Sequence, residues 1–221
     1  MAVGRLSPLQ VRVLEALAGV SPPWTLTGGG ALAGFHTAHR TTRDLDLFFR
    51  GENTLGDVPL EVRDRLADRG ISATVVRTTP RLSQLDVSDG ADSVIVDLVA
   101  DPTPIAEPPE PMALGTVTVL VDTMHQLLVN KLCALLSRSE LRDLVDVRVL
   151  LERGGDLARA LEDCPRQDAG FSPLTFGWSV RGLPVERLAV ALGHSPEEAA
   201  TLAAFRDGLV ARVIDAARPD A

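Results

Sequence analysis

The stretch 25–49, "TLTGGGALAGFHTAHRTTRDLDLFF", decides how the first part of this chain folds. A short apolar run leads into three glycines, and a second apolar run holds two aspartates one residue apart. Alternate side chains of a strand share a face, so Asp44 and Asp46 are expected to point the same way while the leucine after each points to the other side. The pattern predicts a strand, a glycine turn, a helix over 31–39 and a strand over 44–49.

The combination of a glycine turn and two carboxylates indicates a site for a phosphorylated ligand and a divalent cation. Two carboxylates about 7 Å apart along a strand can hold such cations through oxygen ligands. The backbone amides of Gly28, Gly29 and Gly30, between a strand and a helix, can accept phosphate. Each feature alone also fits a wet edge strand or an ordinary chain reversal. Because the glycine turn and the aspartate pair occur in this order along the chain, we favour a site for a phosphorylated ligand and a cation.

The chain around this stretch is predicted to contain both helices and strands, and the part that follows is predicted to be helical. A capping box of Ser7 and Gln10 predicts a first helix, and another helix is expected over about 59–69. Asp89-Gly90 predicts a hairpin turn, and residues 100–111, with five prolines, predict a loop. We expect further strands over 72–78, 82–88, 93–99 and 116–121.

From residue 122 onward the sequence is all-helical in character. Ser139 is expected to cap the second helix of this part, and Ser195 with Glu198 forms a capping box for the last. The fold class is therefore α+β, a mixed sheet with flanking helices followed by a helical C-terminal half. We predict an α/β domain over 1–121 and a helical domain over 122–221, with the ligand in the cleft between them.

Composition narrows the class of protein. The chain is 45% hydrophobic and 24% charged, and no apolar run approaches the ~20 residues that a membrane span needs. Its start does not resemble a signal peptide, and two cysteines do not suggest a disulfide scaffold or a zinc site, so we expect a cytoplasmic protein with no membrane partner. The net charge of −8 excludes non-specific coating of nucleic acid but leaves room for a local basic groove.

The basic residues are 21 arginines and a single lysine, Lys131. A compact ammonium that touches phosphate as a point charge is one place where arginine would not serve. Asp143 and Asp146 are three residues apart on one helix face, and we expect Asp143 to pair with Arg142 or Arg148. Four of the eight aromatic residues, Trp24, Phe171, Phe176 and Trp178, are expected in the core rather than as stacking platforms for bases.

Two segments together resemble a known family. "TGGGALAGFHTAHRTTRDLDLFF" resembles the glycine turn, helix and Asp-x-Asp strand of the DNA polymerase β-like nucleotidyltransferase superfamily. "HQLLVNKLCALLSRSELRDLVDVRVLL", over 125–151, resembles the lysine helix and "RDxxD" helix of the AbiEii/MenT nucleotidyltransferase toxins. The two segments make up less than a quarter of the chain.

The resemblance implies roles for residues of the first segment. Gly28 and Gly29 would cradle the triphosphate of an NTP. Thr42 stands where the family usually has a hydroxyl residue two places before the first aspartate. Asp44 and Asp46 would be catalytic and would bind the metal, Mg²⁺ or Mn²⁺.

The second segment receives roles in the same way. Lys131 matches the triphosphate-binding lysine of the family, and we count it among the catalytic residues. A helical aspartate near the site corresponds to Asp143 or Asp146. We prefer Asp146 as the catalytic residue and place Asp143 with Arg138 among the nucleotide-binding residues.

A third metal-binding carboxylate is common in the superfamily. Asp97 is the best candidate, because a carboxylate among valines costs several kcal/mol unless a cation or hydrogen bonds compensate. Asp86 is its competitor. Family members often have Ser or Thr where this chain has Gly30, so a hydroxyl contact to phosphate is expected to be missing. His36, His39, Arg40 and Arg43 crowd the same region, where they can contact an RNA backbone.

The implied function is metal-dependent transfer of a nucleoside monophosphate from an NTP to an acceptor hydroxyl. By resemblance the acceptor is the 3′ end of a tRNA, and the protein is a toxin with a cognate antitoxin. Transfer to a small cationic acceptor such as an aminoglycoside is the alternative, which the negative net charge favours. A nucleotide-binding module without catalysis is the third reading.

Overall fold

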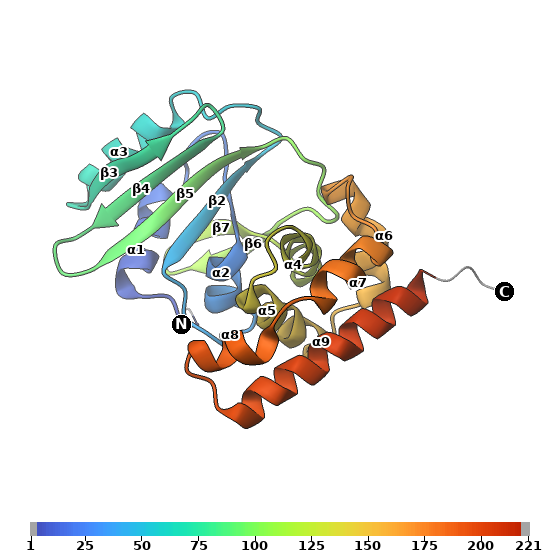
Figure 1. Cartoon of the computed structure of the whole chain (residues 1–221). Coiled ribbons are helices and arrows are strands. Elements are labelled where there is room, and N and C mark those ends of the chain that lie inside the picture. The colour runs from blue at the N-terminus through green and yellow to red at the C-terminus, as the bar shows by residue number, and fades with distance from the viewer. Residues whose placement is uncertain (1–3, 218–221) are drawn as a thin grey trace. The chain divides into compact units, whose positions relative to one another are not determined.

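The computed structural model describes residues 4–217, and the chain divides into two compact units. The first unit ends at Thr123 and the second begins at Met124. Figure 1 shows their elements. Across the described residues, no helix is both long and apolar enough to cross a membrane.

The first unit is built on one mixed sheet. Over residues 4–123 its seven strands follow the order β3-β4-β5-β2-β1-β7-β6. The β2–β5 and β1–β7 pairs are parallel, and the other neighbours are antiparallel. The strands are β1 Thr25–Thr27, β2 Asp44–Arg50, β3 Ser72–Thr78, β4 Leu82–Ser88, β5 Ser93–Asp101, β6 Glu110–Leu114 and β7 Val117–Val121. A mixed sheet with flanking helices was predicted, and the sheet confirms it.

Buried and partly exposed side chains alternate along β2, so one face of the sheet is covered and the other is more open. Leu45, Leu47 and Phe49 are fully buried, and burial of such a side chain contributes about 2 kcal/mol. The two helices α1 (Pro8–Leu17) and α3 (Val58–Ala67) lie behind the strands in Figure 1. The aspartates between those apolar residues therefore belong to the opposite face.

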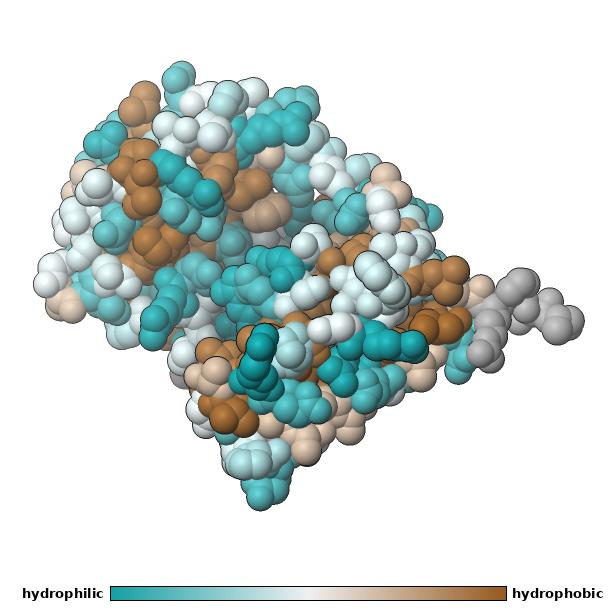
Figure 2. Space-filling view, in the orientation of Figure 1, coloured by the Kyte–Doolittle hydropathy of each residue, from teal (hydrophilic) through white to brown (hydrophobic). Residues whose placement is uncertain are grey.

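That opposite face is only partly apolar on its surface. Over β3, β4 and β5, brown and teal side chains intermingle in the space-filling view (Figure 2). On the edge strand β3, Val75 and Val76 are exposed. This mixture of polar and apolar side chains fits a sheet face that is not sealed by a continuous core.

The glycines begin a helix instead of preceding one. The helix α2 covers Gly28–Ala31 and continues as the π-helical turn η1, Leu32–His36, whereas the sequence predicted a helix over 31–39. Gly28 has a φ of +61°, a conformation that glycine adopts without steric cost. The chain therefore turns from β1 into the helix within one residue.

The remaining strands follow the predicted order with one omission. The Asp89-Gly90 turn joins β4 and β5, and Asp89 Oδ1 accepts hydrogen bonds from the N–H groups of Ala91 and Asp92. Strand β6 lies partly within the segment that was predicted as a loop. Pro111 is tolerated in it because β6 is an edge strand, where a missing N–H need not break a ladder.

The second unit is helical. The capping box of Ser195 and Glu198 is present at the start of its last helix, as predicted. Ser139 has a φ of +50° and the cap of α5 is Glu140, so the prediction of a Ser139 cap was wrong. The helices are α4 Met124–Arg138, α5 Leu141–Glu152, α6 Leu157–Gln167, α7 Pro173–Arg181, α8 Val185–Ala191 and α9 Pro196–Ala216.

One aromatic residue lies on the surface, against expectation. Trp178 is 83% exposed, whereas Trp24, Phe171 and Phe176 are buried. On α7 the inward face is taken by Phe176, Gly177 and Val180. A helix turns by about 100° per residue, so position 178 points outward although its type suggested the core.

Candidate active site

The two aspartates of β2 lie on the more open face of the sheet, in the middle of its strand order. Asp46 is the register partner of Thr27 on β1 and of Asp97 on β5. Neighbouring strands are about 4.8 Å apart, so the side chains of Asp46 and Asp97 rise side by side from this face. Asp44 stands two residues earlier on the same face, and Gln84 continues the row beyond Asp97.

The register separates the two candidates for a third carboxylate. Asp97 is directly beside Asp46, and its Oδ1 accepts a hydrogen bond of 2.8 Å from Gln84 Nε2. Asp86 is exposed and lies on β4, opposite Ile95 and one strand farther from β2. The structure therefore brings Asp97 to the aspartate pair and leaves Asp86 at a distance.

Two glycines allow side chains to approach the backbone at the start of α2. A Cβ atom on Gly28 would lie 2.2 Å from Oδ2 of Asp46. One on Gly29 would lie 2.6 Å from Oγ1 of Thr42 and 3.3 Å from Nη2 of Arg40. Both distances to oxygen are shorter than any real Cβ contact, so these positions require glycine for the carboxylate and the hydroxyl to sit where they do.

The third glycine faces the other way. A Cβ atom on Gly30 would lie 2.9 Å from Leu26 Cδ1 and 3.2 Å from Leu45 Cδ2, both in the buried core. A side chain at this position would therefore enter the core and not the site. The missing hydroxyl that the sequence indicated at Gly30 has a packing reason.

The loop before β2 is held by hydrogen bonds to Asp44 and to α1. The hydroxyl of Thr42 donates a hydrogen bond to Oδ1 of Asp44. Gln10, which is buried on α1, donates from Nε2 to the carbonyl oxygen of Thr42 over 3.0 Å. Gln10 was predicted only as part of a capping box, and its second role follows from a tertiary contact that local sequence does not encode.

A buried charge network that the sequence did not indicate lies at the far end of β2. Arg50 binds the carboxylates of Asp101 and Asp122, the second over 2.7 Å. Its guanidinium also lies 4.9 Å from the ring centre of Phe48. Arg50 is thus held by partners on two other strand ends and is not directed toward a ligand.

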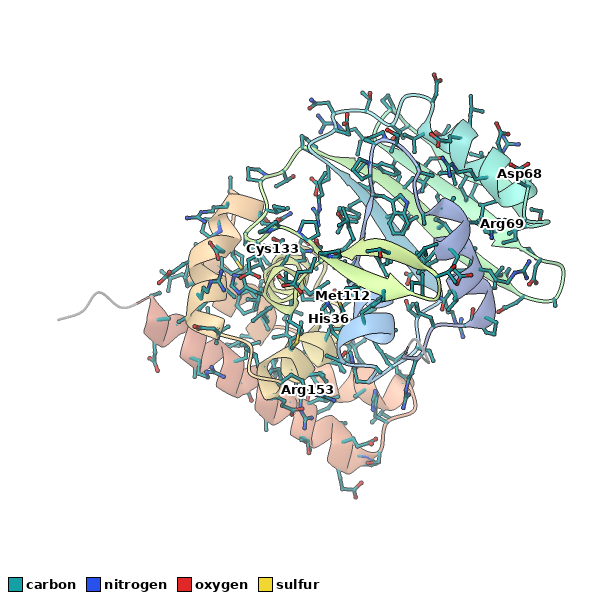
Figure 3. All side chains as sticks on the ribbon, turned by 180° about the vertical axis from the view of Figure 1, so that it is seen from behind. His36, Asp68, Arg69, Met112, Cys133 and Arg153 are labelled. Carbon is teal, nitrogen blue, oxygen red and sulfur yellow. The ribbon has the colours of Figure 1, made fainter. Side chains whose placement is uncertain are left out.

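The two histidines of the region are engaged in hydrogen bonds within the first unit. His36, labelled in Figure 3, lies at the end of η1 with its Nε2 2.8 Å from the carbonyl oxygen of Asp122. His39 Nδ1 lies 2.7 Å from the hydroxyl of Thr37. Both contacts are to uncharged oxygen atoms and serve to fix the local chain.

The second unit contains a buried cluster around its single lysine. Lys131 Nζ lies 2.9 Å from Asp143 Oδ1 and 2.7 Å from Asp146 Oδ2. Arg138 binds the same Asp143 through two nitrogens, at 2.8 and 2.9 Å. Lys131 is 6% exposed and both aspartates are fully buried. The corner between α4 and α5 therefore assembles all four residues that the sequence singled out in this segment.

The pairing of Asp143 differs from the prediction. Its partners are Lys131 and Arg138, not Arg142 or Arg148. Arg142 pairs with Glu140 and Arg148 with Glu152. The helical turn places Asp143 on the buried face of α5 while the two arginines lie toward its surface, so adjacency in sequence was a poor guide.

Comparison with known proteins decides the family. The family model described as "Nucleotidyl transferase AbiEii toxin, Type IV TA system" matches residues 12–210. The chain belongs to the AbiEii family. It is therefore a nucleotidyltransferase of the toxin–antitoxin class, as the two sequence segments had indicated.

Solved structures share the fold of this AbiEii protein. MenT4, a nucleotidyltransferase toxin from Mycobacterium tuberculosis H37Rv, is 20% identical, with a TM-score of 0.61 over 96% of this chain and 82% of its own. JHP933 from Helicobacter pylori is 14% identical, with a TM-score of 0.57 over 94% and 91%. At these identities the likeness concerns the fold. The comparison with curated proteins gave no significant match.

The carboxylates of this AbiEii chain have the oxygen donors that suit a divalent cation. Over residues 4–217, no three His, Cys, Asp or Glu side chains form a group that can hold one ion by themselves. Mg²⁺ in nucleotide sites is usually bound by one or two carboxylates, with phosphate oxygens and water as its other ligands. Asp44 and Asp46 provide two carboxylates on one face, and Asp97 lies beside them.

Replacement of Gly28 by alanine is expected to stop the transferase, because the added methyl group would occupy the position of the Asp46 carboxylate. Gly51→Ala is the matched control, since Gly51 has a φ of +80° with open space around it. Both variants should lose about 1–2 kcal/mol of stability through the left-handed backbone. Only Gly28→Ala should lose activity in a transfer assay. Equal activity of the two variants would contradict the assigned geometry.

The pKa of Asp143 lies below its ordinary value. Burial works to raise it, but the hydrogen bond from Arg138 and the charge of Lys131 outweigh burial. Because the folded state holds the proton less tightly than the unfolded state, this carboxylate stabilises the protein above its ordinary pKa. That contribution is lost as the pH falls through the lowered value.

We therefore expect the second unit to lose stability in acid, below about pH 4. The replacement Asp143→Asn should flatten the dependence of the free energy of unfolding on pH in this range. Urea unfolding followed by circular dichroism at a series of pH values measures both. Parallel curves for the variant and the wild type would show that Asp143 does not carry the effect.

Proposed function

We propose that this nucleotidyltransferase transfers a nucleoside monophosphate from an NTP to the 3′ end of a tRNA, with Mg²⁺ or Mn²⁺ as its cofactor. The observation that carries the proposal is the arrangement of Asp44, Asp46 and Asp97 on one sheet face, against the backbone of Gly28. A glycine backbone and a set of carboxylates facing one another suit a metal-bound triphosphate.

In this proposal, each site residue of the first unit has a defined task. Asp44 and Asp46 hold the cation, and Asp97 adds a third oxygen donor from the next strand. When bound, the cation neutralises phosphate charge and lowers the pKa of the attacking hydroxyl. Thr42 fixes the rotamer of Asp44 through its hydrogen bond, and the amides of Gly28 and Gly29 receive the phosphate chain.

The cluster of the second unit supplies positive charge in the proposal. Lys131 donates a hydrogen bond of 2.9 Å to Asp143 Oδ1, and its Nζ lies 2.7 Å from Asp146 Oδ2. In the proposal the Lys131 ammonium, which can donate three hydrogen bonds, neutralises the leaving pyrophosphate. Asp146 orients Lys131, while Arg138 and Asp143 contribute to nucleotide binding.

The proposed acceptor and partner fit the toxin role of the family. Modification of the tRNA end would block translation and make the protein a toxin, and a type IV system implies a cognate antitoxin. The net charge of −8 favours a second candidate, a small cationic acceptor of the aminoglycoside class. Nucleotide binding without transfer is the third.

A labelling assay distinguishes these functions. Purified protein is incubated with Mg²⁺, each α-labelled NTP in turn, and either total tRNA or an aminoglycoside. We expect label in tRNA from the wild type and from Asp68→Asn, a variant of the exposed C-cap residue of α3, but not from Asp44→Asn. Label in the aminoglycoside alone would support the second candidate. Tight binding of NTP without label in either acceptor would support the third.

A further inference from the structure

The guanidinium of Arg40 lies at the glycine turn. Its Nη2 is 3.3 Å from where a Cβ atom of Gly29 would be, next to the hydroxyl of Thr42. Thr42 in turn donates to Asp44. Arg40 is therefore a cation placed over the backbone that the proposed function assigns to the phosphate chain.

The loop that carries Arg40 is fixed by several hydrogen bonds. Thr37 and Ala38 both donate from their backbone N–H groups to the carbonyl oxygen of Leu32, at 3.0 and 2.9 Å. Ala38 has a φ of +47°, which is unusual for a residue other than glycine. Arg40 Nη1 donates to the carbonyl oxygen of Thr41 over 3.1 Å. These contacts hold the chain where it crosses the start of α2.

When a nucleotide binds at the glycine turn, a nearby cation is needed to offset the negative charge that gathers there. Asp44 and Asp46 are acidic, and a triphosphate adds further negative charge at the same place. Of the other arginines near β2, Arg43 is exposed, and Arg50 lies at the opposite end of the strand from Asp44. Arg40 is the guanidinium whose position matches the backbone of Gly29.

We propose that Arg40 binds the phosphate chain of the NTP across Gly29. The inference rests on the proposed function and adds to it a specific residue that contacts the phosphate chain. Arginine suits this task because its planar fork donates two parallel hydrogen bonds to phosphate oxygens. The sequence had suggested an RNA backbone as the ligand of Arg40 and Arg43, and the position of Arg40 beside Gly29 favours the nucleotide instead.

Calorimetric titration with each of the four NTPs in Mg²⁺ tests the proposal. For the NTP that the wild type binds, Arg40→Gln should weaken Kd by about 10- to 100-fold, the range for loss of a charged hydrogen bond. Arg40→Lys keeps the positive charge but loses the two parallel donors of the guanidinium. Its Kd should lie between those of the wild type and Arg40→Gln. Arg43→Gln is the matched control from the exposed neighbour and should stay within about twofold of the wild type.

The outcomes separate this inference from the proposed function. If the wild type binds no NTP, both the inference and the proposed function fail. If it binds one and Arg40→Gln binds it equally well, the inference alone is overturned. Titration with tRNA provides the last comparison: weaker binding of tRNA with unchanged binding of NTP would overturn the inference in favour of an RNA contact. A thermal unfolding curve for Arg40→Lys shows whether the loop tolerates substitution.

Discussion

Replacement of Asp46 by asparagine is expected to lower the rate of nucleotide transfer by about a thousandfold or more. Its carboxylate lies against Gly28 and beside Asp97, so its charge is central to the proposed cation site. A catalytic metal ion contributes several kcal/mol of transition-state stabilisation, and each ~1.4 kcal/mol changes the rate tenfold. Steady-state transfer of label from an α-labelled NTP measures the effect.

Asp86→Asn is the matched control for this prediction. Asp86 lies on the same sheet as Asp97 but is exposed and one strand farther from β2. We expect its activity to equal that of the wild type, and Asp97→Asn to lose activity together with Asp46→Asn. A loss in Asp86→Asn with full activity in Asp97→Asn would reverse the assignment of the third carboxylate.

Replacement of Lys131 by methionine is expected to destabilise the protein by about 3–5 kcal/mol, the cost of leaving a buried charge without its partner. Asp143 would keep Arg138, but Asp146 would lose the ammonium that lies 2.7 Å from it in a fully buried position. Urea unfolding followed by circular dichroism gives the free energy. A loss below about 1 kcal/mol would show that the cluster is solvated or rearranges easily.

A double variant separates the structural role of Lys131 from its proposed chemical role. Lys131→Met combined with Asp146→Leu removes both charges, so it should be more stable than Lys131→Met alone. We expect the double variant to fold and yet remain inactive, because no ammonium is present for the phosphate. Recovery of activity together with stability would mean that Lys131 acts only through folding.

Much of the fold was readable from local patterns. The alternation in β2 predicted a strand with its aspartates on one face, and two capping boxes predicted the starts of α1 and α9. These patterns depend on hydrogen bonds between near neighbours and on side-chain periodicity, which the sequence displays directly. The family was indicated by the resemblance of two short segments to its motifs, and the family model confirms it.

The features that sequence reasoning missed depend on contacts between distant segments. The network of Arg50 joins residues from three strand ends, and no local pattern marks it. Gln10 reaches Thr42 from another helix. Trp178 was misjudged because residue type was given more weight than its place on α7. In each case the outcome was set by tertiary packing, which propensity alone does not determine.

In the proposed function, Asp44 and Asp46 hold a divalent cation together with a nucleotide. The most direct measurement is a Mn²⁺ titration followed by electron paramagnetic resonance, with a non-hydrolysable NTP analogue present. We predict that the wild type and Asp86→Asn bind Mn²⁺ in a nucleotide-dependent manner, and that Asp46→Asn binds it at least about tenfold more weakly. Equal binding of Mn²⁺ by Asp46→Asn and the wild type would contradict the claim.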